Sequence, residues 1–155
     1  MDFKIIGLAS DHAGFELKQY VKQYLDEKGV AYKDYGTFTE ESCDYPDFAH
    51  ALAQGIESGE VYPGIGICGS GEGIAMTLNK HQGVRAGLAW NREIAHLIRQ
   101  HNDANIAGFG VRQHSAEEAM RILDAFIAES FSGDARHQGR IDQVRDYERA
   151  RRQGA

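Results

Sequence analysis

The chain of 155 residues is long enough to bury a core within one domain, and 42% of its residues are hydrophobic. Its formal net charge of −6 argues against a nucleic-acid partner, because proteins that bind the phosphate backbone carry strongly basic surfaces. We expect one domain over residues 1–155 with no membrane span and no signal peptide. The chain has only two cysteines, Cys43 and Cys68, which is too few for a disulfide framework and fits a reducing cytoplasm. The alternative is a single disulfide between them.

Five short apolar runs alternate with segments of helical periodicity along the chain. This alternation predicts an α/β protein, a Rossmann-like three-layer α/β/α sandwich around a five-stranded parallel sheet. From the doubly wound folds we expect the strand order 2-1-3-4-5. The predicted strands lie within residues 3–9, 30–35, 64–68, 84–89 and 106–109.

Helix start signals support the same reading. Pro46 suits the first turn of a helix, because its missing N–H has no partner there. Ser115 and Glu118 have the spacing of a capping box before the apolar stripe that includes Leu123. A charged segment at about residues 133–152 predicts a solvated C-terminal helical tail.

The expected strand order predicts where a ligand would bind. In such sheets ligands lie beyond the carboxyl ends of the strands, at the switch point between the first and third strands. The stretch "SDHAG" at residues 10–14 follows the first strand, and "CGSGEG" at residues 68–73 follows the third. Two polar, glycine-containing loops are therefore expected to form one crevice.

The glycine loop predicts an anion hole beside a thiol. Gly69, Gly71 and Gly73 let a ligand approach the backbone, and the next helix points its free N–H groups at the crevice. A helix N-terminus can activate Cys68 as a base or nucleophile, although a lone cysteine is more often a small buried hydrophobe. The spacing G-x-G-x-G is a poor match to a dinucleotide-binding fingerprint.

Two residues after the first strand have an ordinary and a functional interpretation. Asp11 can cap a helix beginning near Ala13, and His12 can be a plain surface residue. His12 is equally well placed to hold an anion at the mouth of the crevice. Arg136 and Arg140, one helical turn apart, can present two guanidinium groups to a phosphate or form a solvated face.

His101 raises a geometric problem. It continues the helical stripe of Ile94, Leu97 and Ile98, which favours a satisfied core histidine. Because it precedes the fifth strand, it is expected at the amino edge of the sheet, away from Cys68. If both serve one site, a two-fold dimer is required in which His101 and Asn102 of one subunit complete the crevice of the other.

Several motifs in order resemble one family. The stretches "SDHAGFELK", "DYPDFA", "CGSGEGIA", "RQHNDANIAGFG" and "RHQGRI" resemble the type B ribose-5-phosphate isomerases, in a family that also contains galactose-6-phosphate isomerase subunits. The match extends from Phe3 to about Ile141. The resemblance implies a homodimer or dimer of dimers with active sites at the subunit interface. It also implies interconversion of ribose 5-phosphate and ribulose 5-phosphate without metal or organic cofactor.

The resemblance implies a role for each matching residue. Cys68 would shuttle a proton between C1 and C2 through an enediolate, with the N–H groups of residues 70–73, beginning at Ser70, stabilising the charged oxygen. His101 would open the furanose ring. The implied substrate-binding residues are Asp11, His12, Tyr45, Gly69, Gly71, Glu72, Gly73, Asn102, Arg112, Arg136 and Arg140.

The chain departs from the family pattern at a few positions. Ile74 stands where one branch of the family has a glutamate that acts as the base. Its absence favours Cys68 as the base, with Glu72 as the weaker alternative. Ser70 replaces a frequent threonine, and the approach to Arg136 is slightly longer than usual. The alternatives are an isomerase of a six-carbon sugar phosphate, such as galactose 6-phosphate or allose 6-phosphate, and a noncatalytic module that binds a phosphosugar.

Overall fold

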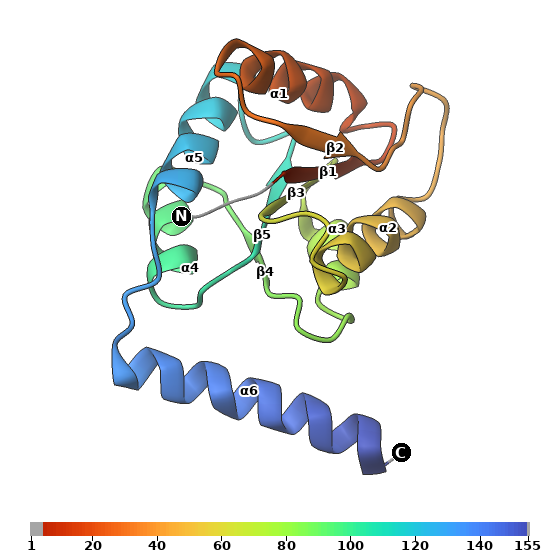
Figure 1. The fold of residues 1–155 in the computed structure, drawn as a ribbon. Coiled ribbons are helices and arrows are strands. Elements are labelled where there is room, and N and C mark those ends of the chain that lie inside the picture. Colours follow the sequence, from red (N-terminus) through yellow and green to blue (C-terminus); the bar gives the residue numbers. More distant parts are fainter. Residues whose placement is uncertain (1–4, 155) are drawn as a thin grey trace.

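The computed structural model describes residues 5–154 and shows a five-stranded parallel sheet between two layers of helices (Figure 1). This confirms the predicted fold class. Phe3, where the first predicted strand begins, lies outside the described residues. The strands are β1 (Ile6–Ser10), β2 (Tyr32–Asp34), β3 (Gly64–Cys68), β4 (Ala86–Leu88) and β5 (Ile106–Gly110). The helices are α1 (Phe15–Glu27), α2 (Tyr45–Glu57), α3 (Glu72–Leu78), α4 (Arg92–Gln100), α5 (Ala116–Ala128) and α6 (Ala135–Gly154).

The order of the last two strands differs from the expectation. The observed order is β2-β1-β3-β5-β4, so β5 and not β4 lies beside β3. All five residues of β5 are buried, as an interior strand covered on both faces requires, whereas the three residues of β4 are half-buried, as at an edge. Because β1 and β3 remain neighbours, the switch point stays where the sequence predicts it.

Each face of the sheet has its own hydrophobic core. Helices α1, α4 and α5 cover one face, and α2 and α3 cover the other (Figure 1). Leu25 of α1 and Phe126 of α5 belong to the first core, while Leu52 of α2 and Ile74 of α3 belong to the second. Fully burying such a side chain contributes roughly 1.5–3 kcal/mol. The second core also contains Cys68, which therefore ends its strand against packed apolar side chains.

Local signals set the helix starts. Pro46 lies in the first turn of α2, and the Ser115 hydroxyl caps α5 by accepting a hydrogen bond from the Glu118 N–H at 3.1 Å. Helix α1 begins at Phe15, later than the expected start near Ala13. The Asp11 carboxylate accepts a hydrogen bond from the Gly14 N–H at 3.0 Å, so it closes the turn before the helix.

Helix α6 lies apart from both helical layers (Figure 1). Its far end is tied to the loop after α3, where the Arg152 guanidinium donates to the Lys80 carbonyl at 3.0 Å. Its approach is tied to α4, because the Ser132 N–H donates to the Gln100 carbonyl at 3.0 Å. Within residues 5–154 no helix has both the length and the apolar character that crossing a membrane demands. Both cysteines are free.

Candidate active site

Cys68 lies at the carboxyl end of β3, in contact with the glycine loop. Its side chain is 4% exposed, and its Sγ accepts a hydrogen bond from the Gly71 N–H at 3.2 Å. Gly71 has φ of 82°, and a Cβ there would lie 2.8 Å from the carbonyl carbon of Phe109. Glycine is therefore required where the loop turns back over the sulfur.

The same loop offers donors for an anion. The Glu72 N–H donates to the Ser70 hydroxyl at 3.2 Å, whereas the N–H groups of Gly69 and Ser70 donate to no other group in the described part of the chain. A Cβ on Gly69 would lie 3.0 Å from the guanidinium carbon of Arg112, so this cation lies directly over the loop. Free N–H groups next to a guanidinium suit a developing oxyanion or a phosphate.

Two other predicted residues, Asp11 and Tyr45, lie beside β3 and this loop, and His12 follows Asp11 in the chain. The Asp11 N–H donates to the Ile67 carbonyl at 3.2 Å, which places Asp11 beside the carboxyl end of β3. The Tyr45 ring packs on Gly73, where a Cβ would lie 2.5 Å from the ring carbon Cζ. His12 is exposed, with its Nδ1 at 3.2 Å from the N–H nitrogen and from the carbonyl oxygen of Cys43. We call the group of Asp11, His12, Tyr45, Cys68, residues 69–73 and Arg112 the thiol half-site.

Lys18 supports this half-site and has no role in the sequence-based predictions. It is fully buried, and its Nζ lies 2.7 Å from an Asp34 carboxylate oxygen and 2.5 Å from the Thr37 carbonyl. Burial lowers the pKa of Lys18, while the Asp34 carboxylate opposes that shift. The Thr37 N–H donates to the Ser10 carbonyl at 2.7 Å, so Lys18 fixes the loop after β2 beside the end of β1.

His101, Asn102 and Arg140 meet at a different corner. They line a cavity of about 290 Å³ together with Arg85, His137, Ile141 and Val144. The Arg85 guanidinium donates to the Asn102 carbonyl at 3.1 Å. We call the group of His101, Asn102, Arg136, His137 and Arg140 the histidine half-site. No group of three or more His, Cys, Asp or Glu side chains in residues 5–154 is arranged to hold a metal ion.

The sequence-based prediction of the buried stripe on α4 is only partly right. The buried residues of this helix are Ala95 and Arg99, and Ile98 and His101 are half-buried. Arg99 replaces an apolar residue in the interior because its guanidinium donates to the Ala104 carbonyl at 2.5 Å and pairs with Asp103 at 2.9 Å. His101 is thus not a core histidine, since it faces a cavity.

His137 is the functional candidate that sequence reasoning missed. It is 8% exposed, and its ring centroid lies 4.2 Å from that of His101. Its Nδ1 lies 3.0 Å from the Ser132 hydroxyl, and its Nε2 lies 3.3 Å from an Arg136 guanidinium nitrogen. The only sequence signal was its place inside "RHQGR", between the two predicted arginines.

Within one chain, the two half-sites lie at opposite ends of the parallel strands. Cys68 is paired with Gly110 at the carboxyl end of β5, whereas His101 precedes Ile106, the first residue of that strand. This separation agrees with the expectation that the two groups do not meet within a chain. Cys68 does not line the 290 Å³ cavity, nor does it line a second, larger hollow that lies between α6 and the body of the molecule.

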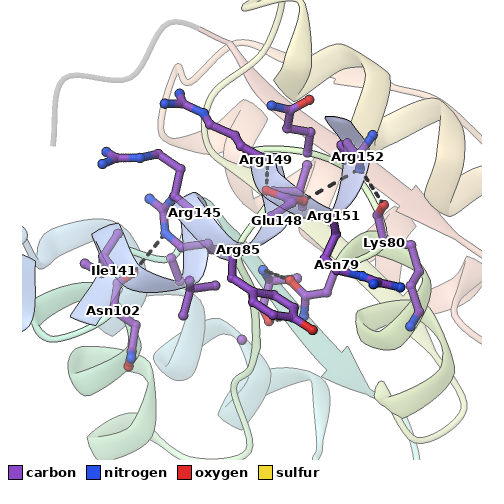
Figure 2. Close-up of a pocket in the computed structure, with 18 of the residues that line it drawn as sticks. Asn79, Lys80, Arg85, Asn102, Ile141, Arg145, Glu148, Arg149, Arg151 and Arg152 are labelled. Carbon is purple, nitrogen blue, oxygen red and sulfur yellow. Dashed lines mark hydrogen bonds and ion pairs between the residues drawn. The ribbon is translucent and has the colours of Figure 1, made fainter. Parts of the chain in front are cut away.

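The larger hollow separates α6 from the body of the molecule and measures about 700 Å³. Its apolar lining includes Ile141, Val144 and Tyr147 of α6, which face Ile98 and Ala104. Figure 2 shows Arg145, Arg149, Arg151 and Arg152 of α6 around it, together with Arg85, Asn102 and Ile141. Asn102, Arg85, Ile141 and Val144 line both spaces, so the hollow is continuous with the histidine half-site.

Comparisons with known proteins point to one family. A family model described as Ribose/Galactose Isomerase matches residues 6–144. "Ribose-5-phosphate isomerase B" of Escherichia coli is 40% identical over 96% of this chain and 99% of its own length. The solved ribose-5-phosphate isomerase B of Clostridium thermocellum is 39% identical, with a TM-score of 0.92 over 94% of this chain and 98% of its own. That of Mycoplasma genitalium, solved with bound ribulose 5-phosphate, is 38% identical, with a TM-score of 0.87 over 93% of this chain and 95% of its own.

Proposed function

The chain belongs to the Ribose/Galactose Isomerase family, and from that premise we propose that it interconverts ribose 5-phosphate and ribulose 5-phosphate without a metal or organic cofactor. The observation that carries the proposal is the hydrogen bond between the Cys68 sulfur and the Gly71 N–H. It joins a base to a loop of backbone donors, and proton abstraction next to a carbonyl needs both.

The chemistry proceeds by proton transfer. The Cys68 thiolate removes the proton from C2 of the open-chain aldose, and the electrons of that C–H bond form an enediolate. Of the donors predicted at residues 70–73, the Gly71 N–H is bonded to the sulfur and the Glu72 N–H to the Ser70 hydroxyl. The free N–H groups of Gly69 and Ser70, with the Arg112 guanidinium over them, therefore stabilise the negative oxygen. The hydroxyl proton on O2 passes to O1, and the Cys68 thiol returns the carbon-bound proton to C1, so that C2 becomes the carbonyl carbon of the ketose. Asp11 and Tyr45 bind sugar hydroxyls at the edge of the loop.

We propose that the active unit is a cytoplasmic homodimer of one isomerase domain, with α6 as its tail. The support is that each chain carries two half-sites that it does not join. Val144 and Tyr147 of α6 are 65% and 70% exposed, and such apolar exposure is typical of a surface that another chain covers. In the dimer, His101 of one subunit opens the sugar ring in the thiol half-site of the other, and the neighbouring Asn102 binds sugar hydroxyls there. His12, Arg136 and Arg140 bind the phosphate.

A direct assay tests the proposed base. Ribose 5-phosphate is incubated with the wild-type chain, and ribulose 5-phosphate is measured. Cys68→Ala is expected to lose at least about a hundredfold in kcat, because general bases contribute that much or more. Glu72→Gln, which removes the other contender, is expected to lose less. Full activity of Cys68→Ala would remove the proposal.

The family name includes galactose, so a six-carbon substrate is the second candidate. Comparing kcat/KM for ribose 5-phosphate, allose 6-phosphate and galactose 6-phosphate separates the two. We expect the five-carbon substrate to be preferred, because the relatives from Escherichia coli and Clostridium thermocellum, matched along nearly their whole length, are named for it. Stabilisation by all three sugars without turnover of any would instead indicate a noncatalytic binding module.

A further inference from the structure

His137 is the one buried residue that α6 contributes within the described span. Its ring lies against the ring of His101, with the centroids 4.2 Å apart and the planes tilted by 34°. The rest of α6 is half-buried or exposed. The position of His101 therefore depends on a residue from another element.

The hydrogen-bond partners of His137 assign its tautomer. A guanidinium can only donate, so the Arg136 nitrogen at 3.3 Å makes Nε2 of His137 an acceptor. The neutral ring then carries its proton on Nδ1 and donates it to the Ser132 hydroxyl at 3.0 Å. The Ser132 N–H donates to the Gln100 carbonyl, next to His101 in the chain. Both ring nitrogens are thus engaged, and the imidazole is held at each end.

The surroundings favour the neutral form of this imidazole. Burial lowers the pKa of His137, and the nearby His101 and Arg136 lower it further, while Asp134 opposes them. Protonation would remove the acceptor that Arg136 uses. The charged and titratable groups that face His137 are His101 after α4, Arg136 and Arg140 of α6, Asp134 before α6, and Arg85, which is itself paired with Asp103 at 3.3 Å.

We propose that His137 is a positioning residue that joins the ring-opening His101 to the phosphate-binding Arg136. Its ring face steadies His101, and its Nε2 lone pair steadies the Arg136 guanidinium. One neutral side chain thereby sets the spacing between the group that acts on the sugar ring and the group that binds the phosphate. This inference rests on the proposed function, which supplies the roles of His101 and Arg136.

Two substitutions separate the two contacts. His137→Phe keeps an aromatic face and removes both nitrogens, so KM for ribose 5-phosphate is expected to rise about tenfold while kcat stays within about threefold. His137→Gln keeps an acceptor and removes the ring face, so kcat is expected to fall about tenfold while KM stays within about threefold. Gln138→Ala, at the exposed neighbouring position, is the control and is expected to change neither constant. A loss of kcat in both variants with KM unchanged would mean a merely structural role and would overturn the inference.

A second measurement does not depend on turnover. NMR of the ring nitrogens and of Cε1–H in the wild-type chain is expected to show His137 protonated on Nδ1, with a titration midpoint below 6.5. A midpoint at or above 6.5, or a proton on Nε2, would overturn the positioning role. If the wild-type chain shows this NMR signature but no isomerase turnover, the hydrogen-bonded state of His137 is supported and the proposed function is refuted.

Discussion

Two glycines with similar backbone angles illustrate how the thiol half-site is built residue by residue. Gly71 and Gly59 have φ of 82° and 76°. A Cβ on Gly59 would meet nothing within 4 Å, whereas a Cβ on Gly71 would lie 2.5 Å from Leu88 and 2.8 Å from the backbone of Phe109. Only Gly71 combines a left-handed conformation with close contact to neighbouring backbone.

This contrast predicts different costs for the same substitution. Gly59→Ala is expected to cost about 1–2 kcal/mol of unfolding free energy, the strain of a left-handed alanine. Gly71→Ala adds a backbone clash and is expected to cost more than about 3 kcal/mol, because the buried loop must shift. Urea unfolding of both variants measures the difference, and equal stability would contradict the close packing at Gly71.

Lys18 and Lys22 pair with the same carboxylate from different depths. Both bind Asp34, at 2.7 and 3.1 Å, but the side chain of Lys18 is fully buried and that of Lys22 is 26% exposed. Lys18→Met is expected to cost about 3 kcal/mol or more, because it leaves the Thr37 carbonyl unpaired and weakens a buried pair. Lys22→Met is expected to cost less than about 1 kcal/mol. Similar thermal unfolding midpoints for the two variants would show that burial does not distinguish them.

At the scale of elements, α6 differs from the other helices in how it is held. Helices α1 to α5 pack on the sheet through apolar faces, whereas α6 is attached near its start by the ring contact of His137 with His101 and near its end by the hydrogen bond from Arg152 to Lys80. Between these attachments lies the 700 Å³ hollow of Figure 2. Its attachment near His101 therefore involves a buried histidine, His137.

A pH dependence follows from this attachment. Because the pKa of His137 is lowered in the folded chain, the unfolded state binds protons more readily as the pH falls below 6.5. The contribution of His137 to stability is therefore present above pH 6.5 and is lost as the pH falls through its folded pKa. Urea unfolding at about pH 7.5 and about pH 5.5 should show a larger loss for the wild-type chain than for His137→Phe. Identical losses would rule out this contribution.

Elements also show what the sequence could predict. The strands were visible because parallel strands covered on both faces read as apolar runs, as in the fully buried β1, β3 and β5. The order of β4 and β5 could not be predicted from the sequence, because it depends on which of the two strands is more deeply covered in the assembled sheet. The Cys68 loop was marked by its glycines, whereas His137 and Lys18 matter through partners far away in the chain.

At the scale of the whole molecule, the separation of the half-sites predicts complementation between inactive chains. Cys68→Ala and His101→Asn are each expected to be nearly inactive as homodimers. After the two variants are refolded together in equal amounts, half of the dimers contain one chain of each kind. Each such mixed dimer has one intact site and one site that lacks both groups. Activity is then expected to reach about a quarter of the wild-type value.

The control for this experiment mixes two variants of the same half-site. Cys68→Ala refolded with Cys68→Ser leaves no intact thiol half-site, so no recovery is expected. If the mixture of Cys68→Ala and His101→Asn is no more active than its parents, Cys68 and His101 do not serve one site across two chains.

Because Cys68 and His101 lie at opposite ends of the strands, the protein should behave differently at low concentration. A catalyst assembled from two chains exists only while those chains remain associated, so mass action governs its output. Specific activity, which is constant for a self-sufficient protomer, should decline on dilution below the dissociation constant of the pair and return on reconcentration.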